Sequence, residues 1–312
     1  MYMLKIIKVT ENSKNYKLGK FILNSISSLN ERNIKRNIQF GKIRLNGNKA
    51  CYDSNLNVGD EITLEISDKF FNIKIDKSFL KAPNKIDVIY EDNNLLIVNK
   101  PIGLLSQIDK NQKIDTLENR CRKYLYDKKE FKLDENTLFI PTLCNRLDFN
   151  TSGLIIIAKN IQVLRIINEK LSTSEIKRYY VCWVHGRLDG SGIISTYLTK
   201  DNKTNKVKVI DKKTNYSTKA ITNYKVIAYD SKNDISTLEI ELVTGKTHQI
   251  RAHLQHIKHP IVGERKYSNS DSKHSTQALI SYKLVFCFKP SANILNYLLN
   301  KTIELSKKKL FK

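Results

Sequence analysis

The stretch Leu143–Ala158 reads LCNRLDFNTSGLIIIA and joins a polar, ionisable half to an uninterrupted apolar half. The apolar run has the length and the β-branched composition of a buried strand. The preceding Asn150–Gly153 is typical of a tight turn in which side chains hydrogen-bond the backbone. We therefore interpret Thr151 and Ser152 as parts of the turn rather than as nucleophiles.

An arginine and a carboxylate stand just before this turn. In an extended segment alternate residues share a face, so Arg146 and Asp148 would lie together while Leu147 points the other way. A carboxylate among apolar residues resists ionisation unless a nearby cation stabilises its charge. The residues alone leave two interpretations open, a structural ion pair at a strand end and a catalytic site.

Most of the chain beyond this stretch also has strand character. From Ile86 onward, strand-like runs such as YYVCWVHG, KAITNYKVIAY and STLEIELVTG dominate, and helical patterns appear at Ile114–Asp127 and Asn160–Leu171. Many strands with few helices predict an α+β fold with a mixed, mainly antiparallel sheet. The Leu- and Lys-rich tail from Asn293 predicts a terminal helix.

The N-terminal part has a different pattern. Residues 14–66 predict a compact unit with a first helix around Leu18–Ile26, a second over Glu31–Phe40, and a hairpin at Asn46-Gly47. We assign residues 67–85 to a linker and 86–312 to a catalytic domain. The second helix and the next strand could form one basic face, with a solvated helix face as the alternative. The basic residues concerned are Arg32, Lys35, Arg36, Lys42 and Arg44.

Composition indicates a polyanionic partner. The chain has 312 residues, with 54 Lys and Arg against 31 Asp and Glu, giving a formal net charge of +23. Such an excess points to nucleic acid, although a codon bias toward Lys, Asn and Ile is the alternative. Five widely spaced cysteines without a C-x-x-C motif favour a reducing cytoplasm. We find no secretory signal pattern and no apolar run long enough to span a membrane.

Two further segments carry candidate residues. Thr244–Tyr267 holds four of the six histidines and predicts a helix over HQIRAHLQHI. Its histidine spacing matches no common metal-binding motif, so we expect these histidines to contact RNA or cap the backbone. In Arg178–Gly186, strand alternation places Tyr180 and Cys182 on one face, where a tyrosine either packs in the core or stacks on a base. No phosphate-binding glycine loop occurs, so we expect no nucleotide cofactor.

Four segments in order resemble the RluA-type pseudouridine synthases of ribosomal and transfer RNA. They are DVIYEDNNLLIVNKPIGLL, NRLDFNTSGLIIIAKN, RYYVCWVHG and TGKTHQIRAHLQHIKHPIVGERKY, and the likeness covers the chain from about Lys17 to Phe288. The second segment is the most specific, because it is close to the family signature HRLDxxTSGLxxxAK. Residues 14–66 resemble the S-four-like (alpha-L) RNA-binding domain, although Lys17–Ile22 lacks the aspartate of that family's opening motif.

The resemblance implies a role for individual residues. Asp148 matches the catalytic aspartate, Tyr180 the active-site tyrosine, and Arg251 the basic partner of the aspartate. Arg146 matches the arginine that occupies the space left by a flipped uridine, and His248 is expected to bind RNA. Gln277 and Leu279 match residues that form the wall of the site in this family.

The implied activity is isomerisation of specific uridines in large-subunit ribosomal RNA, without metal or other cofactor, by a monomer. A transfer-RNA synthase and a non-catalytic RNA-binding assembly factor are the alternatives. Three positions depart from the family pattern. Asn145 stands where most members have histidine, Arg178 replaces lysine, and Glu264 replaces aspartate. Asparagine keeps hydrogen bonding but cannot change its charge near neutral pH.

Overall fold

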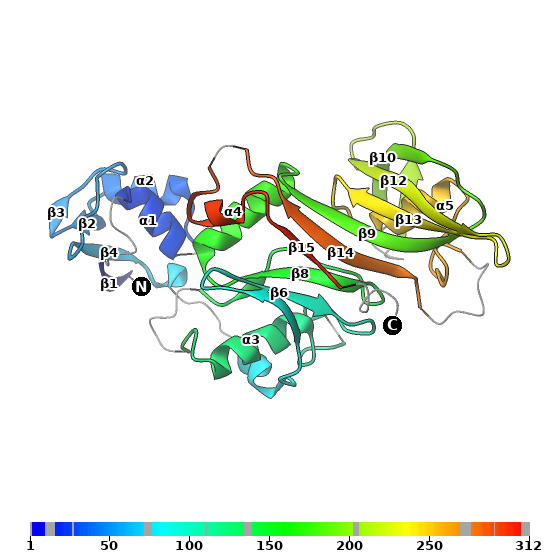
Figure 1. Cartoon of the computed structure of the whole chain (residues 1–312). Coiled ribbons are helices and arrows are strands. Elements are labelled where there is room, and N and C mark those ends of the chain that lie inside the picture. The colour runs from blue at the N-terminus through cyan, green and yellow to red at the C-terminus, as the bar shows by residue number, and fades with distance from the viewer. Residues whose placement is uncertain are drawn as a thin grey trace. The chain divides into compact units, whose positions relative to one another are not determined.

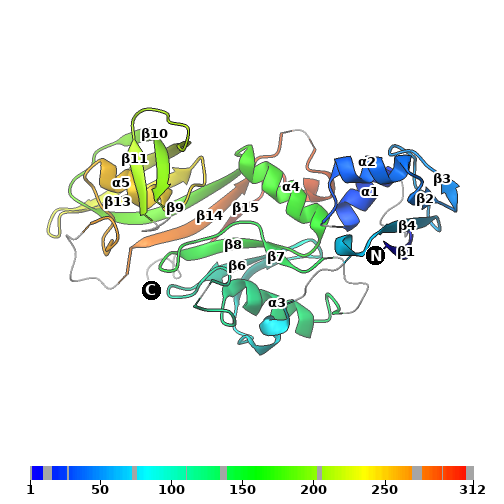
Figure 2. The same ribbon diagram turned by 180° about the vertical axis from the view of Figure 1, so that it is seen from behind.

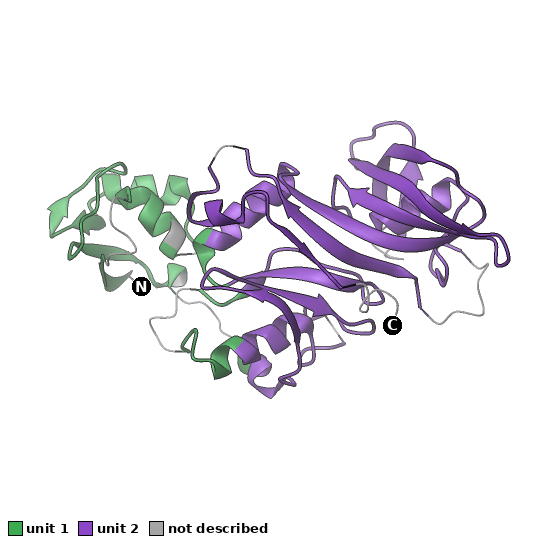
Figure 3. Cartoon of the chain, in the orientation of Figure 1, with its two compact units in different colours: residues 1–77, 125–141, 159–162 green, residues 78–124, 142–158, 163–312 purple. Residues whose placement is uncertain are grey.

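A computed structural model describes residues 2–9, 16–26, 28–71, 76–109, 111–133, 139–201, 206–268, 276–289 and 291–306 (Figure 1). The chain forms two compact units (Figure 3). The first comprises residues 1–77, 125–141 and 159–162, and the second comprises residues 78–124, 142–158 and 163–312. No described helix is long and apolar enough to cross a membrane.

The first unit pairs a small antiparallel sheet with two helices. The strands are β1 (Tyr2–Lys8), β2 (Ile43–Leu45), β3 (Asn48–Lys49) and β4 (Glu61–Ser67), in the order β1-β4-β2-β3, and the helices are α1 (Leu18–Ser25) and α2 (Glu31–Gln39). The turn between β2 and β3 uses Asn46 and Gly47, both with positive φ, as a two-residue hairpin requires. The domain limits 14–66, 67–85 and 86–312 stay a prediction, and β1 lies outside the first of them.

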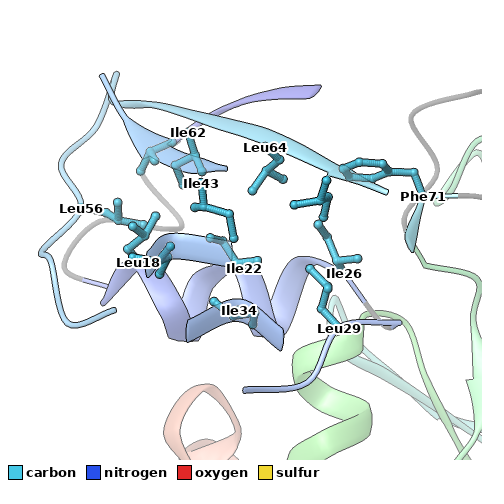
Figure 4. Close-up of a cluster of buried hydrophobic side chains, with 13 residues drawn as sticks. Leu18, Ile22, Ile26, Leu29, Ile34, Ile43, Leu56, Ile62, Leu64 and Phe71 are labelled. Atoms are coloured by element: carbon cyan, nitrogen blue, oxygen red, sulfur yellow. The ribbon is translucent and has the colours of Figure 1, made fainter. Parts of the chain in front are cut away.

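A single hydrophobic core holds this unit together (Figure 4). Leu18, Ile22 and Ile26 on α1 are buried against Ile34 on α2 and against the sheet. Each fully buried side chain of this size contributes about 1.5–3 kcal/mol. Asn30 caps α2 by accepting a hydrogen bond from the Asn33 backbone N–H at 2.8 Å. Sequence periodicity was therefore sufficient to place both helices.

The second unit is built on a large sheet. Its strands are β5 (Asp87–Glu91), β6 (Leu95–Lys100), β7 (Thr142–Leu143), β8 (Ser152–Ala158), β9 (Ile176–His185), β10 (Ser191–Asp201), β11 (Lys206–Ile210), β12 (Thr218–Asp230), β13 (Ile235–Leu242), β14 (Leu279–Phe286) and β15 (Thr302–Glu304). Their order is β11-β10-β12-β13-β9-β14-β8-β6-β5, with β15 beside β14 and β7 beside β8. Of the described pairings only β14 with β8 is parallel. The predicted α+β fold with a mixed, mainly antiparallel sheet is confirmed.

Three helices accompany this sheet. They are α3 (Leu117–Asp127), α4 (Ile161–Ser172) and α5 (Gln249–His256), together with short 3-10 helices at Lys77–Lys81 and Asn293–Leu298. A further 3-10 helix at Asp68–Phe70 belongs to the first unit. Figure 2 shows α5 against the β10–β13 part of the sheet, where it contacts β11 and β12. The predicted terminal helix was wrong. The tail instead makes a 3-10 turn and then β15, because Leu295 and Leu298 are buried and Glu304 pairs with Lys283 of β14.

The contact between β8 and β14 brings distant segments together. Gly153 begins this contact with φ +118, and a Cβ there would lie 2.1 Å from the Ser281 carbonyl oxygen. Ser281 pairs with Gly153 on one side and with Tyr180 of β9 on the other. Only glycine permits so close an approach at this φ. The turn before β8, which carries Asp148, therefore lies near Tyr180.

Candidate active site

The segment around Asp148 is fixed by hydrogen bonds on both sides. The Thr151 N–H donates to the Asp148 carbonyl at 3.1 Å and closes a turn over residues 148–151. This turn lies two residues before the predicted Asn150–Gly153, because Ser152 and Gly153 already belong to β8. The Ser106 hydroxyl donates to the Leu147 carbonyl at 2.7 Å and accepts from the Leu147 N–H at 3.1 Å. Gln277 donates to the Thr151 hydroxyl. Asp148 therefore stands on a backbone whose neighbouring polar groups are satisfied, which limits its freedom to move.

Lys100, at the end of β6, also contacts this segment. Its ammonium is fully buried and donates to the carbonyls of Pro101, Leu104 and Phe149 at 2.9, 2.8 and 3.1 Å. Burial lowers the pKa of Lys100 to about 8, although the charge of Asp148 opposes the shift. The ammonium therefore links the loop that follows β6, through Pro101 and Leu104, to Phe149, the residue after Asp148.

Asn145, the main departure from the family signature, serves the same backbone. Its side-chain oxygen accepts from the Ile156 N–H at 2.8 Å, and its amide donates to the Leu154 carbonyl at 3.4 Å. Both partners belong to β8, so Asn145 links the segment before Asp148 to the strand after it. This contact explains how asparagine keeps the hydrogen-bonding role at this position.

Arg251 on α5 is the cation that pairs with Asp148. Its Nη1 donates to Asp148 Oδ2 at 2.7 Å, while Nε and Nη2 donate to the two Glu264 oxygens at 2.6 and 2.9 Å. Burial opposes ionisation of Glu264, but the hydrogen bonds and charge of Arg251 outweigh it and hold the pKa of Glu264 low. Burial likewise acts against the charge on Arg251, and its two carboxylates still raise its pKa. One guanidinium thus joins two carboxylates.

His248 and Tyr267 also lie near Asp148 and Arg251. His248 Nε2 is 3.7 Å from Asp148 Oδ2, and His248 Nδ1 is 2.7 Å from the Tyr267 hydroxyl. The Tyr267 hydroxyl also accepts from the Val207 N–H at 3.0 Å. Burial lowers the pKa of His248 more than the charge of Asp148 raises it, which favours the neutral ring. If Nδ1 of the neutral ring accepts a hydrogen bond from the Tyr267 hydroxyl, the ring proton lies on Nε2 and points toward Asp148.

Tyr180 faces the same cleft from β9. Its side chain is 5% exposed, and burial raises the pKa of its hydroxyl, so the phenol is neutral near pH 7. The cleft has a volume of about 750 Å³. It brings together five residues singled out from the sequence, and Leu279 lines it as expected. The five are Arg146, Asp148, Tyr180, His248 and Arg251.

The basic residues predicted in the N-terminal unit belong to α2 and its surroundings. Arg32, Lys35 and Arg36 line one shallow surface pocket on α2 together with Glu31. Lys35 pairs with Glu31 at 2.6 Å, and both side chains are more than half exposed. Arg44 on β2 donates to the Gly41 carbonyl at 2.9 Å. Three of the predicted cations therefore share one surface of the first unit.

The histidines of the α5 segment have structural partners. His253 is fully buried between the hydroxyls of Thr196 and Thr222, at 3.1 and 2.9 Å, and burial lowers its pKa to about 4. For His253 the expectation of an RNA or backbone contact was therefore wrong, because the ring is fully buried between two side-chain hydroxyls. His259 does contact the backbone, because its Nδ1 lies 2.9 Å from the His185 carbonyl oxygen. Among the described residues no group of three His, Cys, Asp or Glu could hold a metal ion.

Several residues of the site were missed as partners by sequence reasoning. Glu264 was noted only as a charge-keeping substitution, and Lys100, Ser106 and Tyr267 were not assigned a role. A buried charge needs a counter-charge, so the Arg251 on an apolar helix face was a signal that a second carboxylate existed. Which carboxylate it was depends on tertiary contacts.

The chain is similar in sequence and in fold to known proteins. A family model described as RNA pseudouridylate synthase matches residues 94–256, which include Asp148, Tyr180 and Arg251. An uncharacterized RNA pseudouridine synthase of Mycoplasma genitalium is 30% identical over 89% of this chain and 88% of its own length. Ribosomal large subunit pseudouridine synthase D of Borreliella burgdorferi is 32% identical over 86% of this chain and 80% of its own. The solved structure of human RNA pseudouridylate synthase domain containing 4 shares the fold, with TM-score 0.52 and 19% identity over 64% of this chain and 84% of that one.

Proposed function

The chain belongs to the RNA pseudouridylate synthase family, whose members are isomerases that convert uridine to pseudouridine, and we propose that it modifies specific uridines of large-subunit ribosomal RNA with Asp148 as the catalytic carboxylate. The single observation that carries the catalytic assignment is the Asp148–Arg251 contact of 2.7 Å inside the cleft. This contact supports the assignment, because it pairs a carboxylate with a cation in the cleft that we take to receive the nucleotide.

The reaction sets the demands on the site. The bond between N1 of uracil and C1′ of the ribose breaks, the base rotates, and a bond between C5 and C1′ forms while the C5 proton is lost and N1 gains one. Substrate and product are isomers, so neither an electron donor nor an electron acceptor is consumed. Asp148 attacks the sugar or the base, or takes a proton from the sugar, and each of these roles requires its anionic form.

The neighbouring residues support that anion and the flipped base. Arg251 stabilises the Asp148 carboxylate by a charge-assisted hydrogen bond. Tyr180 offers an aromatic face for a uracil taken out of the stack, and a neutral phenol for proton movement. Arg146 is exposed at the cleft rim, where it can fill the place that the flipped uridine leaves in the RNA.

Two observations favour ribosomal RNA as the substrate. The Borreliella relative is named as a ribosomal large subunit synthase. The chain carries a formal net charge of +23, and the α2 surface with Arg32, Lys35 and Arg36 adds a basic face in the first unit. We infer that this unit is an S-four-like RNA-binding domain and that Lys42, Arg44 and His248 also contact RNA.

The test compares ribosomal and transfer RNA from cells with and without the gene. Pseudouridines are mapped by carbodiimide modification and primer extension, and loss of a large-subunit ribosomal site is expected. Loss of a transfer-RNA site alone would refute the substrate, and no lost site would favour the non-catalytic assembly factor.

Asp148→Asn tests the catalytic assignment with purified protein. Release of tritium from C5-labelled uridine in RNA should fall by a factor of about 10³ or more, while RNA affinity stays within about threefold, because Arg251 keeps Glu264 as a partner. Asp189→Asn, on a side chain 78% exposed, is the matched control and should behave as wild type. Wild-type activity in Asp148→Asn would remove Asp148 from the mechanism.

A further inference from the structure

Arg178 lies inside the cleft but takes no part in the network around Asp148. It is on β9, two residues before Tyr180, and both side chains line the cleft. Alternation along a strand puts residues two apart on the same face, separated by about 7 Å. Arg178 therefore lies beside the tyrosine expected to stack on the uracil, rather than under the base itself.

The Arg178 side chain is partly buried and has few hydrogen-bond partners. Its Nη2 donates to the Leu242 carbonyl at 3.4 Å, and its Nε is buried without a hydrogen-bond partner among the described residues. Burial lowers the pKa of Arg178, but an arginine stays protonated in proteins. Arg120 offers a contrast, because Asp115 binds two of its nitrogens at 2.6 and 2.9 Å. A buried cation without a counter-ion is costly unless a ligand supplies one.

Gly245 makes the room that this guanidinium occupies. A Cβ at Gly245 would lie 2.6 Å from Arg178 Nη1, and the backbone there does not have the positive φ that would by itself favour glycine. The adjoining loop is held by the Ser174 hydroxyl, which donates to the Val243 carbonyl at 3.0 Å. Because residue 245 has no side chain, it does not cover the guanidinium of Arg178.

The charge of the cleft lining selects an anion. Asp148 is its sole carboxylate among the described lining residues, and Arg251 already pairs with it. The remaining lining cations come from β9, β10 and two loops. They are Arg146, Arg178, Lys200 and Lys246. A phosphate supplies both the missing charge and acceptors for several guanidinium donors.

We infer that Arg178 binds a phosphate of the RNA backbone next to the flipped uridine, and so positions the nucleotide between Tyr180 and Asp148. Gly245 is the residue that keeps the guanidinium accessible to that phosphate. The inference rests on the proposed function, since it takes the cleft to be the place where RNA enters. It makes Arg178 a substrate-binding residue, separate from the group that carries out the chemistry.

The test measures binding to unmodified large-subunit ribosomal RNA transcribed in vitro, at salt concentrations from about 50 to 200 mM. Arg178→Gln should weaken binding about tenfold or more. It should also reduce the slope of log affinity against log salt by about 0.7–0.9, the value for one lost phosphate contact. Arg178→Lys should keep the slope. Lys232→Gln, an exposed cation on the β12–β13 turn, is the control and should change neither quantity by that amount.

Two further measurements keep the inference testable if one variant folds poorly. The thermal midpoint of Arg178→Gln should equal or exceed that of wild type, because an unpaired buried charge is removed. Gly245→Ala should reproduce the smaller salt slope by displacing the guanidinium. The inference would be overturned if Arg178→Gln bound RNA with wild-type affinity, or if Arg178→Gln and Gly245→Ala both kept the wild-type salt slope. Tritium release by the wild-type protein would still support the proposed function in that case. Absence of tritium release by wild type from this RNA would instead count against the proposed substrate.

Discussion

Replacing Glu264 by glutamine should cost the second unit much of its stability. The Glu264 side chain is fully buried and holds Arg251 through two hydrogen bonds of 2.6 and 2.9 Å. Removing one partner of a buried ion pair costs about 3–5 kcal/mol. Asp148 still pairs with Arg251 in the variant, so we expect the lower end, about 3 kcal/mol. For a unit of this size that corresponds to a thermal midpoint lower by about 6–12 °C.

The same ion pair predicts how the loss depends on pH. Because the pKa of Glu264 in the folded protein lies below its ordinary value of 4.5, its charge stabilises the fold above that value. That stabilisation disappears as the pH falls through the folded pKa. The difference between wild type and Glu264→Gln should therefore be constant near neutral pH and shrink below about pH 4.5.

Thermal unfolding followed by circular dichroism between about pH 3.5 and 8 measures both effects. Glu241→Gln is the control, because Glu241 is 26% exposed and pairs with Lys177 at 3.4 Å, so its loss should cost below about 1 kcal/mol. Equal midpoints for wild type and Glu264→Gln at pH 7 would refute the reasoning. So would a difference that widens in acid.

Two more predictions concern the backbone around Asp148. Gly153→Ala should abolish stable folding or lower the thermal midpoint strongly, since its Cβ would lie 2.1 Å from a backbone oxygen. Gly190→Ala has open space around it and should cost only about 1 kcal/mol of folding stability. Similar thermal midpoints for the two variants would contradict this prediction. Asn145→His should keep tritium release at pH 8 and lose it below about pH 6.5, because a protonated ring cannot accept from the Ile156 N–H. A pH profile identical to wild type would contradict that account.

Local sequence patterns predicted most of the fold, and the family resemblance suggested the candidate trio, but neither identified the supporting contacts. Periodicity placed α2 and α5 within one or two residues, and the family signature pointed to Asp148 and Arg251, which the fold does bring together. Glu264 and Lys100 could not be assigned from their neighbours, because each acts through tertiary contacts with a separate segment. The tail from Asn293 was misjudged for a related reason, since its strand pairs with Lys283–Val285 of β14, beyond the residues of β14 that pair with β8.

The charge arrangement of the cleft suggests how it could distinguish the parts of a nucleotide. At its centre one arginine is shared by two carboxylates, so Asp148, Arg251 and Glu264 together carry a net negative charge. A shared cation neutralises each carboxylate incompletely, which leaves Asp148 able to stabilise positive charge that develops at C1′ when the glycosidic bond breaks. The same negative centre repels phosphate. Cations away from that centre, Arg178 and Lys246 among them, attract it. An RNA backbone held by these outer cations would leave its sugar and base, which are uncharged, to enter the space beside Asp148.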